Sequence, residues 1–194
     1  MTRSEATSRL VGRLRDHAVV ASLGHPAYDL FAAGDRPEHF YTWGSMGLAS
    51  SIALGVSLAQ PSRRVIALDG DGSLLMNLGA LATIGSLRPP NLLVVVWDNE
   101  VYGTTGGQPT ATASGVDLAA VARAMGLDAC VVTTLAAFDD ALDRVEQAPH
   151  TMVLVAKVVE SIPAAKPPLD CVAIKQRFMA ALGTPEAGTR ADPR

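Results

Sequence analysis

The chain has 194 residues, of which 48% are hydrophobic and 18% are charged, so it can bury the core of one compact domain. This composition argues against global disorder, and a formal net charge of −3 without a basic stripe gives no electrostatic basis for binding nucleic acid. Cys130 and Cys171 are the two cysteines, and neither belongs to a CxxC pair, which disfavours iron–sulfur clusters and structural zinc.

Strand-like and helix-like segments alternate along the chain, which is the pattern of a parallel sheet covered by helices on both faces. In chain order we predict a helix over 5–15, a strand over 18–23, a helix over 27–33, a strand over 40–43, a helix over 44–59, a strand over 65–68, a helix from about 73, a strand over 91–97, a helix over 117–125, a strand over 130–133, a helix over 135–146, a strand over 152–158 and a helix over 170–182. The predicted fold is therefore α/β: a three-layer, doubly wound, mostly parallel sheet with helices on both faces. We expect a single domain over residues 1–183 and a mobile tail over 184–194.

The sequence also bears on the compartment. Residues 1–16 are charged and lack the apolar core of a signal peptide. No uncharged apolar stretch reaches the length of about 18 residues that a membrane-spanning helix needs. We therefore expect a cytoplasmic protein.

Two polar residues follow apolar strand patterns. Asp71 lies in a Gly-Asp-Gly-Ser segment after the strand predicted over 65–68, and Asn99 lies 28 positions further on, after the strand predicted over 91–97. Ligands in doubly wound sheets bind at the carboxyl ends of the strands, so neighbouring strands could present both residues to one point. A carboxylate and an amide oxygen are hard ligands that suit Mg²⁺. Gly-Asp-Gly alone is more often an ordinary tight turn, but the two residues together favour a metal site.

The residues around Asp71 suit a phosphate group. Gly70 and Gly72 allow the backbone to approach phosphates closely. A helix beginning near Ser73 would direct free N–H groups and its positive dipole end toward a diphosphate. Metal, helix terminus and hydroxyl would then meet at the same anion.

The segment 70–73, with 26 residues between Gly72 and Asn99, resembles the thiamine diphosphate motif of the decarboxylase and acetolactate synthase superfamily. Upstream, 35–41 and 44–51 are similar to sulfopyruvate decarboxylase β-subunits and to the matching part of phosphonopyruvate decarboxylases, and downstream 102–108 is similar to the same group. The resemblance covers roughly residues 18–160. It is more specific for the cofactor than for the substrate.

The resemblance implies a role for each matching residue. Met46 would be the apolar wedge that holds the cofactor bent, and the Gly44 carbonyl would accept a hydrogen bond from its 4′-amino group. An ordinary core methionine is the alternative for Met46. The implied cofactor-binding residues are Gly44, Ser45, Met46, Gly70, Gly72, Ser73, Asn99, Val101, Tyr102 and Gly103, and the implied Mg²⁺ ligands are Asp71, the Asn99 side chain and the Val101 carbonyl.

Two further segments are candidates for the site. His25 lies in the turn after the first predicted strand, which in the family lies near the diphosphate. It could hydrogen-bond a phosphate or the anionic group of the substrate, or it could be an exposed turn histidine, and both interpretations stay open. The segment 102–112 is rich in glycine and threonine and could close over the site. A plain polar connection is the alternative.

Members of the superfamily also need a glutamate against the pyrimidine N1′, and a separate pyrimidine-binding domain supplies it. The chain is too short to hold both domains, and none of its six glutamates lies in a context that resembles that domain. The resemblance thus implies a partner subunit that carries the glutamate, a chain that is inactive alone, and a homodimer with two partner chains as the minimal assembly.

The leading expectation is the β-like subunit of a decarboxylase for 3-sulfopyruvate or 3-phosphonopyruvate. The alternatives are another reaction on the same cofactor, such as acetolactate synthase-like carboligation or another 2-oxo-acid conversion, and a non-catalytic cofactor-binding module. A nucleotide-binding protein of the Rossmann type is disfavoured, because the sequence has neither a GxGxxG turn nor a Walker lysine.

Overall fold

The computed structural model describes residues 1–184, and its centre is a six-stranded parallel sheet in the order β2-β1-β3-β4-β8-β7. The strands are β1 (Ala18–Ala21), β2 (His39–Tyr41), β3 (Val65–Gly70), β4 (Leu92–Asp98), β7 (Asp128–Val132) and β8 (Met152–Lys157). The order reverses at β1, because β2 pairs on one side of it and β3 on the other. A crevice for a ligand is expected where such a reversal meets the carboxyl ends of the strands.

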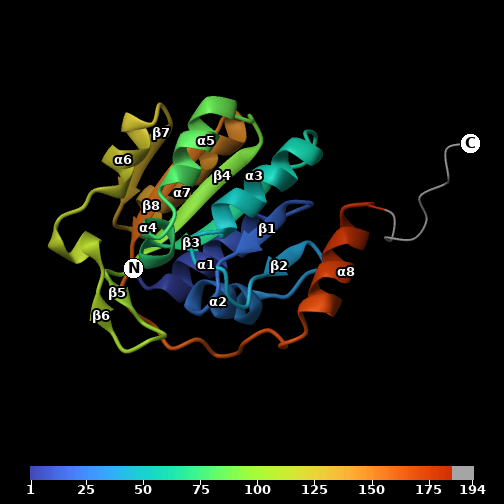
Figure 1. The fold of residues 1–194 in the computed structure, drawn as a ribbon, viewed down its shortest axis with the longest axis horizontal. Coiled ribbons are helices and arrows are strands. Elements are labelled where there is room, and N and C mark those ends of the chain that lie inside the picture. Colours follow the sequence, from blue (N-terminus) through green and yellow to red (C-terminus); the bar gives the residue numbers. More distant parts are fainter. Residues whose placement is uncertain (185–194) are drawn as a thin grey trace, which may run out of the picture.

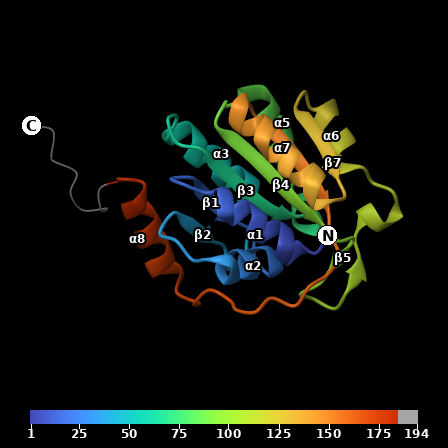
Figure 2. The same ribbon diagram turned by 180° about the vertical axis from the view of Figure 1, so that it is seen from behind.

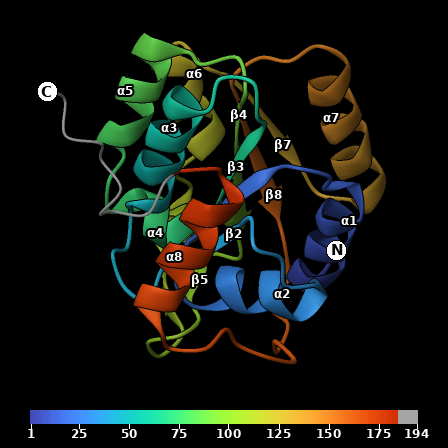
Figure 3. The same ribbon diagram turned by 90° about the vertical axis from the view of Figure 1, so that its right-hand side faces the viewer.

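Helices cover both faces of the sheet and make three layers. They are α1 (Arg3–Arg13), α2 (His25–Ala33), α3 (Ala49–Ala59), α4 (Asp71–Leu75), α5 (Gly79–Leu87), α6 (Leu118–Ala124), α7 (Leu135–Gln147) and α8 (Cys171–Ala181). Figure 3 shows the layers edge on, with α3 and α5 on one side of the sheet and α1 and α7 on the other. Figure 2, the view from behind, brings α7 to the front.

The central strands are buried along almost their whole length, because helices cover both of their faces. On one face Leu10 and Phe138 belong to the same buried cluster as Ile66 of β3. On the other face Leu81 and Leu118 pack in a cluster with the strands. The core is therefore two apolar layers with the sheet between them, and this arrangement confirms the α/β fold class predicted from the sequence.

The chain makes two excursions at the carboxyl edge of the sheet. After β4 it forms the antiparallel hairpin of β5 (Val101–Tyr102) and β6 (Gln108–Pro109), and then the 3₁₀ helix η1 (Ala111–Ser114). After β8 it runs past α2 to α8, which packs on the β2 edge (Figure 1). These excursions bring late parts of the chain next to the ends of the early strands.

One predicted helix start is wrong. The helix predicted over 44–59 begins at Ala49, because Gly44, Ser45 and Gly47 have φ of 142°, 62° and 83°, which a right-handed helix does not allow. The helix predicted from about Ser73 begins at Asp71 and ends after five residues, and α5 follows separately. The polar segment 102–112 contains the hairpin rather than a plain connection.

Within residues 1–184, no helix has both the length and the apolar character needed to cross a membrane. The tail predicted over 184–194 lies, apart from Thr184, outside the described residues. The single-domain boundary at 183 and the cytoplasmic location stay predictions from the sequence.

Candidate functional site

A pocket opens at the carboxyl ends of β1, β3 and β4, where the strand order reverses. The turns after these three strands form most of its lining, and the loop before α3 adds Met46. The predicted site residues that line it are His25, Met46, Gly70, Gly72, Ser73, Asn99, Val101, Tyr102 and Gly103. Gly44, Ser45 and Asp71 do not line the pocket, although each lies within two positions of a residue that does. The roles of these residues stay predictions, but the fold gathers most of them around one space.

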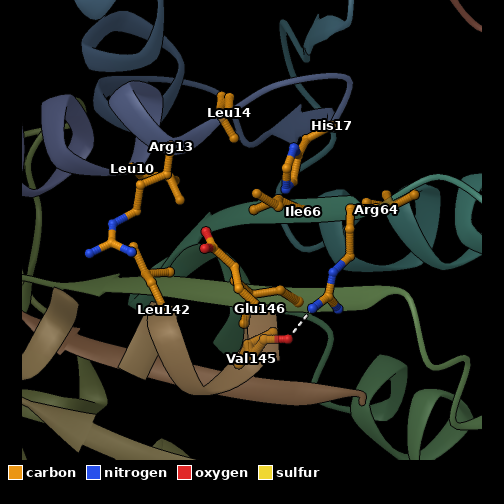
Figure 4. Close-up of a pocket in the computed structure, with 11 residues that line it drawn as sticks. Leu10, Arg13, Leu14, His17, Arg64, Ile66, Leu142, Val145 and Glu146 are labelled. Atoms are coloured by element: carbon orange, nitrogen blue, oxygen red, sulfur yellow. Dashed lines mark hydrogen bonds between the residues drawn. The ribbon is translucent and has the colours of Figure 1, made fainter. Parts of the chain in front are cut away.

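A second hollow lies at the opposite end of the sheet, between α1 and α7 (Figure 4). Its apolar floor includes Leu10 and Ile66, and its charged rim includes Arg13 and Arg64. Both cations already have protein partners: Arg13 pairs with Asp139 and Asp143, and Arg64 donates to a backbone carbonyl of α7. Since both cations of this rim are already bound to the protein, and since the sequence-predicted site residues gather elsewhere, the pocket at the carboxyl ends is the better candidate.

Asp71 is a buried carboxylate without a cationic partner among the described residues. Its side chain accepts hydrogen bonds on Oδ2 from the hydroxyls of Thr110 and Thr112, at 2.6 and 2.9 Å. Burial raises the pKa of Asp71, the two hydroxyls lower it, and the nearby carboxylate of Asp98 raises it further. Asp98 differs because Lys157 pairs with it at 2.8 Å. A buried carboxylate beside a second carboxylate fits a site that a cation completes.

The donor atoms around Asp71 suit Mg²⁺. Gly70 pairs with Trp97 in the register of β3 and β4, so Asp71 and Asn99 follow at the same edge of the sheet. With the Val101 carbonyl they offer three kinds of oxygen, which are the ligands that Mg²⁺ prefers. Residues 1–184 contain no group of three or more His, Cys, Asp or Glu that could hold a metal. A small protein-derived set is typical of Mg²⁺ sites that phosphate oxygens complete.

Buried hydroxyls tie the turns of the pocket together. The Ser73 hydroxyl lies 2.9 Å from that of Ser22, and it accepts a hydrogen bond from the Gly47 N–H at 2.9 Å. Beneath them Asp69 is completely buried. Burial raises the pKa of Asp69, whereas Ser73, Ser22, the Gly70 N–H and Ser50 lower it. This network links the ends of β1 and β3 to the loop that carries Met46.

The loop before α3 depends on its glycines. Gly47 has φ of 83°, and a Cβ at this position would lie 2.8 Å from the Cβ of Asn77 and 3.1 Å from its backbone nitrogen. The Asn77 amide in turn donates to the Gly47 carbonyl at 3.0 Å. The tight turn therefore fixes the backbone next to Met46, which lines the pocket.

Helix α4 is short, so its dipole can supply only a small part of the attraction for an anion. It has five residues, and a macrodipole sums over aligned peptide units. The nine-residue helix α2 begins at His25, beside the same pocket. The N–H groups at two helix starts thus lie near this pocket.

Sequence reasoning missed several residues of the site. Arg3 lines the pocket from the first turn of α1, and Glu160 contacts His25 and Asn99 from the segment after β8. Only the folded chain brings these residues to the ends of β1 and β4. The two threonines that donate to Asp71 lie in the glycine- and threonine-rich segment 102–112. The sequence indicated this segment as a candidate, but not the contact of its threonines with Asp71.

Comparison with protein families agrees with this geometry. Residues 27–156 match the family described as "Thiamine pyrophosphate enzyme, C-terminal TPP binding domain". The chain is 51% identical over 128 residues to the sulfopyruvate decarboxylase subunit beta of Methanothermobacter thermautotrophicus, covering 66% of this chain and 68% of that one. It is 40% identical over 185 residues to the same subunit of Methanococcus maripaludis, covering 94% and 98%.

A longer relative and a solved structure extend the comparison. The chain is 41% identical over 194 residues to the phosphonopyruvate decarboxylase of Streptomyces viridochromogenes, covering 97% of this chain but only 48% of that protein. It thus spans about half the length of that relative. A putative thiamin diphosphate-dependent enzyme from Mycobacterium smegmatis superposes with a TM-score of 0.71 at 25% identity, over 83% of this chain and 32% of the other. Together the comparisons confirm the resemblance and the fold predicted from the sequence.

Proposed function

Since the chain belongs to the thiamine pyrophosphate enzymes, through their C-terminal TPP-binding domain, we propose that it is the thiamine diphosphate- and Mg²⁺-binding subunit of a two-chain 2-oxo-acid decarboxylase. One observation carries the proposal: the Gly-Asp-Gly-Ser turn, the turn at Asn99 and the loop with Met46 converge on a single pocket. The names of the similar sulfopyruvate and phosphonopyruvate decarboxylases support the reaction class.

In this proposal the residues of the chain hold and orient the cofactor. Asp71, the Asn99 side chain and the Val101 carbonyl would hold Mg²⁺, which would neutralise charge of the diphosphate. Gly72 and Ser73 contact the diphosphate. When bound, the cofactor supplies the electron sink that decarboxylation of a 2-oxo acid requires.

The remaining pocket residues serve orientation and closure. Met46 packs against the cofactor as an apolar wedge, and the Gly44 carbonyl accepts from its amino group. The hairpin carrying Tyr102 and Gly103 covers the metal side of the pocket and excludes water. His25 donates to an anionic oxygen of the diphosphate or of the substrate.

We propose 3-sulfopyruvate or 3-phosphonopyruvate as the substrate, because relatives of both names are 40–51% identical to the chain. The proposal includes a partner subunit that carries the glutamate for the pyrimidine ring, and no turnover by this chain alone. The name "subunit beta" of the relatives supports the partner, and self-association to a dimer completes the smallest assembly.

The test is release of CO₂ by the chain purified with and without its partner subunit, with thiamine diphosphate and Mg²⁺ present. We expect turnover of 3-sulfopyruvate or 3-phosphonopyruvate by the pair and none by either chain alone. Pyruvate is the control substrate, and acetolactate is measured alongside. Formation of acetolactate from pyruvate would show that the reaction is carboligation and not simple decarboxylation. Cofactor binding without turnover of any 2-oxo acid would overturn the enzymatic role.

A further inference from the structure

Glu160 is a charged residue beside the pocket, where it contacts the lining residues His25 and Asn99, and the mechanism above gives it no role. It lies three residues after Lys157, the last residue of β8. In this segment the chain pairs with its own N-terminal residues. The Val159 N–H donates to the Met1 carbonyl at 3.0 Å, and the Arg3 N–H donates to the Val159 carbonyl at 3.3 Å. The backbone next to Glu160 is therefore held in place by hydrogen bonds.

The Glu160 carboxylate meets donors from three other parts of the chain. The Asn99 Nδ2 donates to Oε2 at 2.5 Å, the Arg3 guanidinium donates to the same oxygen at 3.2 Å, and Nδ1 of His25 lies 2.7 Å from Oε1. Arg3 is itself fixed, since its Nε donates to the buried carboxylate of Asp29 at 2.5 Å.

The contact with Asn99 fixes which way the amide points. Nδ2 of Asn99 is the donor in this contact, so the NH₂ group faces Glu160 and the amide oxygen does not. The amide oxygen then lies on the other side of the group. Because Asn99 lines the pocket, this rotamer leaves the oxygen available to a cation there.

We propose that Glu160 is a positioning residue, which holds the Asn99 amide with its oxygen directed to the Mg²⁺ position of the pocket. The proposal rests on the proposed function, in which Asn99 is a metal ligand. Groups behind a metal ligand orient it, and removing them typically lowers metal affinity about 10–100-fold. Glu160 would act on the metal through Asn99 and would not touch it.

The test is the Mg²⁺ concentration that gives half-maximal binding of thiamine diphosphate, measured by calorimetry on the chain with its partner subunit. We expect Glu160→Ala to raise this concentration by about tenfold. Glu160→Gln, which keeps an oxygen acceptor, should recover part of the loss. Glu100→Ala is the matched control: it removes the same charge next to Asn99, but its carboxylate contacts Lys157 and should leave Mg²⁺ affinity within about twofold.

A second background separates positioning from a general structural role. Asn99→Asp has two equivalent oxygens and no N–H, so it needs no orienting acceptor and is repelled by Glu160. In that background Glu160→Ala should leave Mg²⁺ affinity unchanged or tighten it. An equal loss in both backgrounds would overturn the proposal, because it would show a structural effect.

Two other outcomes are equally clear. Tighter Mg²⁺ binding by Glu160→Ala in the natural background would mean that the carboxylate competes for the site, which also overturns positioning. If the unchanged chain shows no Mg²⁺-dependent binding of thiamine diphosphate, the proposed function itself fails. Normal binding by the unchanged chain with no effect of Glu160→Ala refutes the role of Glu160 alone.

Discussion

Replacing Gly72 with alanine tests how closely the hairpin after β4 packs on the Gly-Asp-Gly-Ser turn. A Cβ at position 72 would lie 2.4 and 2.7 Å from two ring carbons of Tyr102 and 3.1 Å from a methyl carbon of Thr110. Carbon atoms pack at about 3.5–4.0 Å, so the Tyr102 ring must retreat by about 1 Å. Overpacking of this kind costs about 1–3 kcal/mol of unfolding free energy.

The same change should weaken cofactor binding, because Gly72 and Tyr102 both line the pocket. A displaced hairpin that costs about 1.4 kcal/mol of binding free energy lowers affinity about tenfold. Urea denaturation measures the first effect, and calorimetric titration of thiamine diphosphate with Mg²⁺ measures the second. Gly55→Ala is the matched control: this exposed glycine of α3 has no atom within 4 Å of the added Cβ, and alanine should stabilise the helix by about 1 kcal/mol.

A double variant identifies the cause. Tyr102→Ala removes the ring that the new methyl group meets, so Gly72→Ala should cost much less stability in that background than in the natural chain. An unchanged cost with and without the ring, or unfolding of Gly72→Ala at the same urea concentration as the natural chain, would refute the reasoning.

Three further predictions concern stability. Burial lowers the pKa of His39 to about 4, below the unfolded value of about 6.5. The contribution of neutral His39 to stability is therefore complete above pH 6.5 and is lost as pH falls toward 4. His39→Gln should remove up to about 3 kcal/mol of this pH dependence in urea denaturation, and an unchanged dependence of stability on pH between 7 and 4.5 would contradict this. Gly85→Ala should lower the free energy of unfolding by about 3 kcal/mol without a specific effect on the pocket, because the new Cβ would lie 2.1 Å from the Met125 carbonyl oxygen. Unfolding of this variant at the same temperature as the natural chain would contradict this. Arg3→Met should cost about 3–5 kcal/mol by leaving the buried Asp29 unpaired, and Asp29→Asn added to it should restore part of the loss in the same denaturation assay; no recovery would show that the ion pair is not the cause.

The sheet and the location of its pocket could be predicted because both depend on local pattern. The apolar run at 91–97 has the length of a buried strand, and β4 extends from Leu92 to Asp98. The polar residues that follow β3 and β4 were expected at one edge of the sheet. The parallel register of these strands gives that arrangement.

The rest depends on contacts between distant segments or on backbone conformation. The small residues before α3 suit a helix by composition, but Gly44 and Gly47 have positive φ and form a loop. Arg3 and Glu160 meet at the pocket only because the chain after β8 pairs with its own beginning. No periodicity in one sequence reveals such a pairing, so the positioning network behind Asn99 could be found only in the structure.

The measurement that tests the central claim most directly is calorimetric titration of thiamine diphosphate into the chain with its partner subunit, with and without Mg²⁺. The account predicts binding that requires Mg²⁺ in the natural chain and is lost in Asp71→Ala, whose buried carboxylate is the proposed metal ligand. Equal affinity with and without Mg²⁺, in both the natural chain and Asp71→Ala, would contradict it.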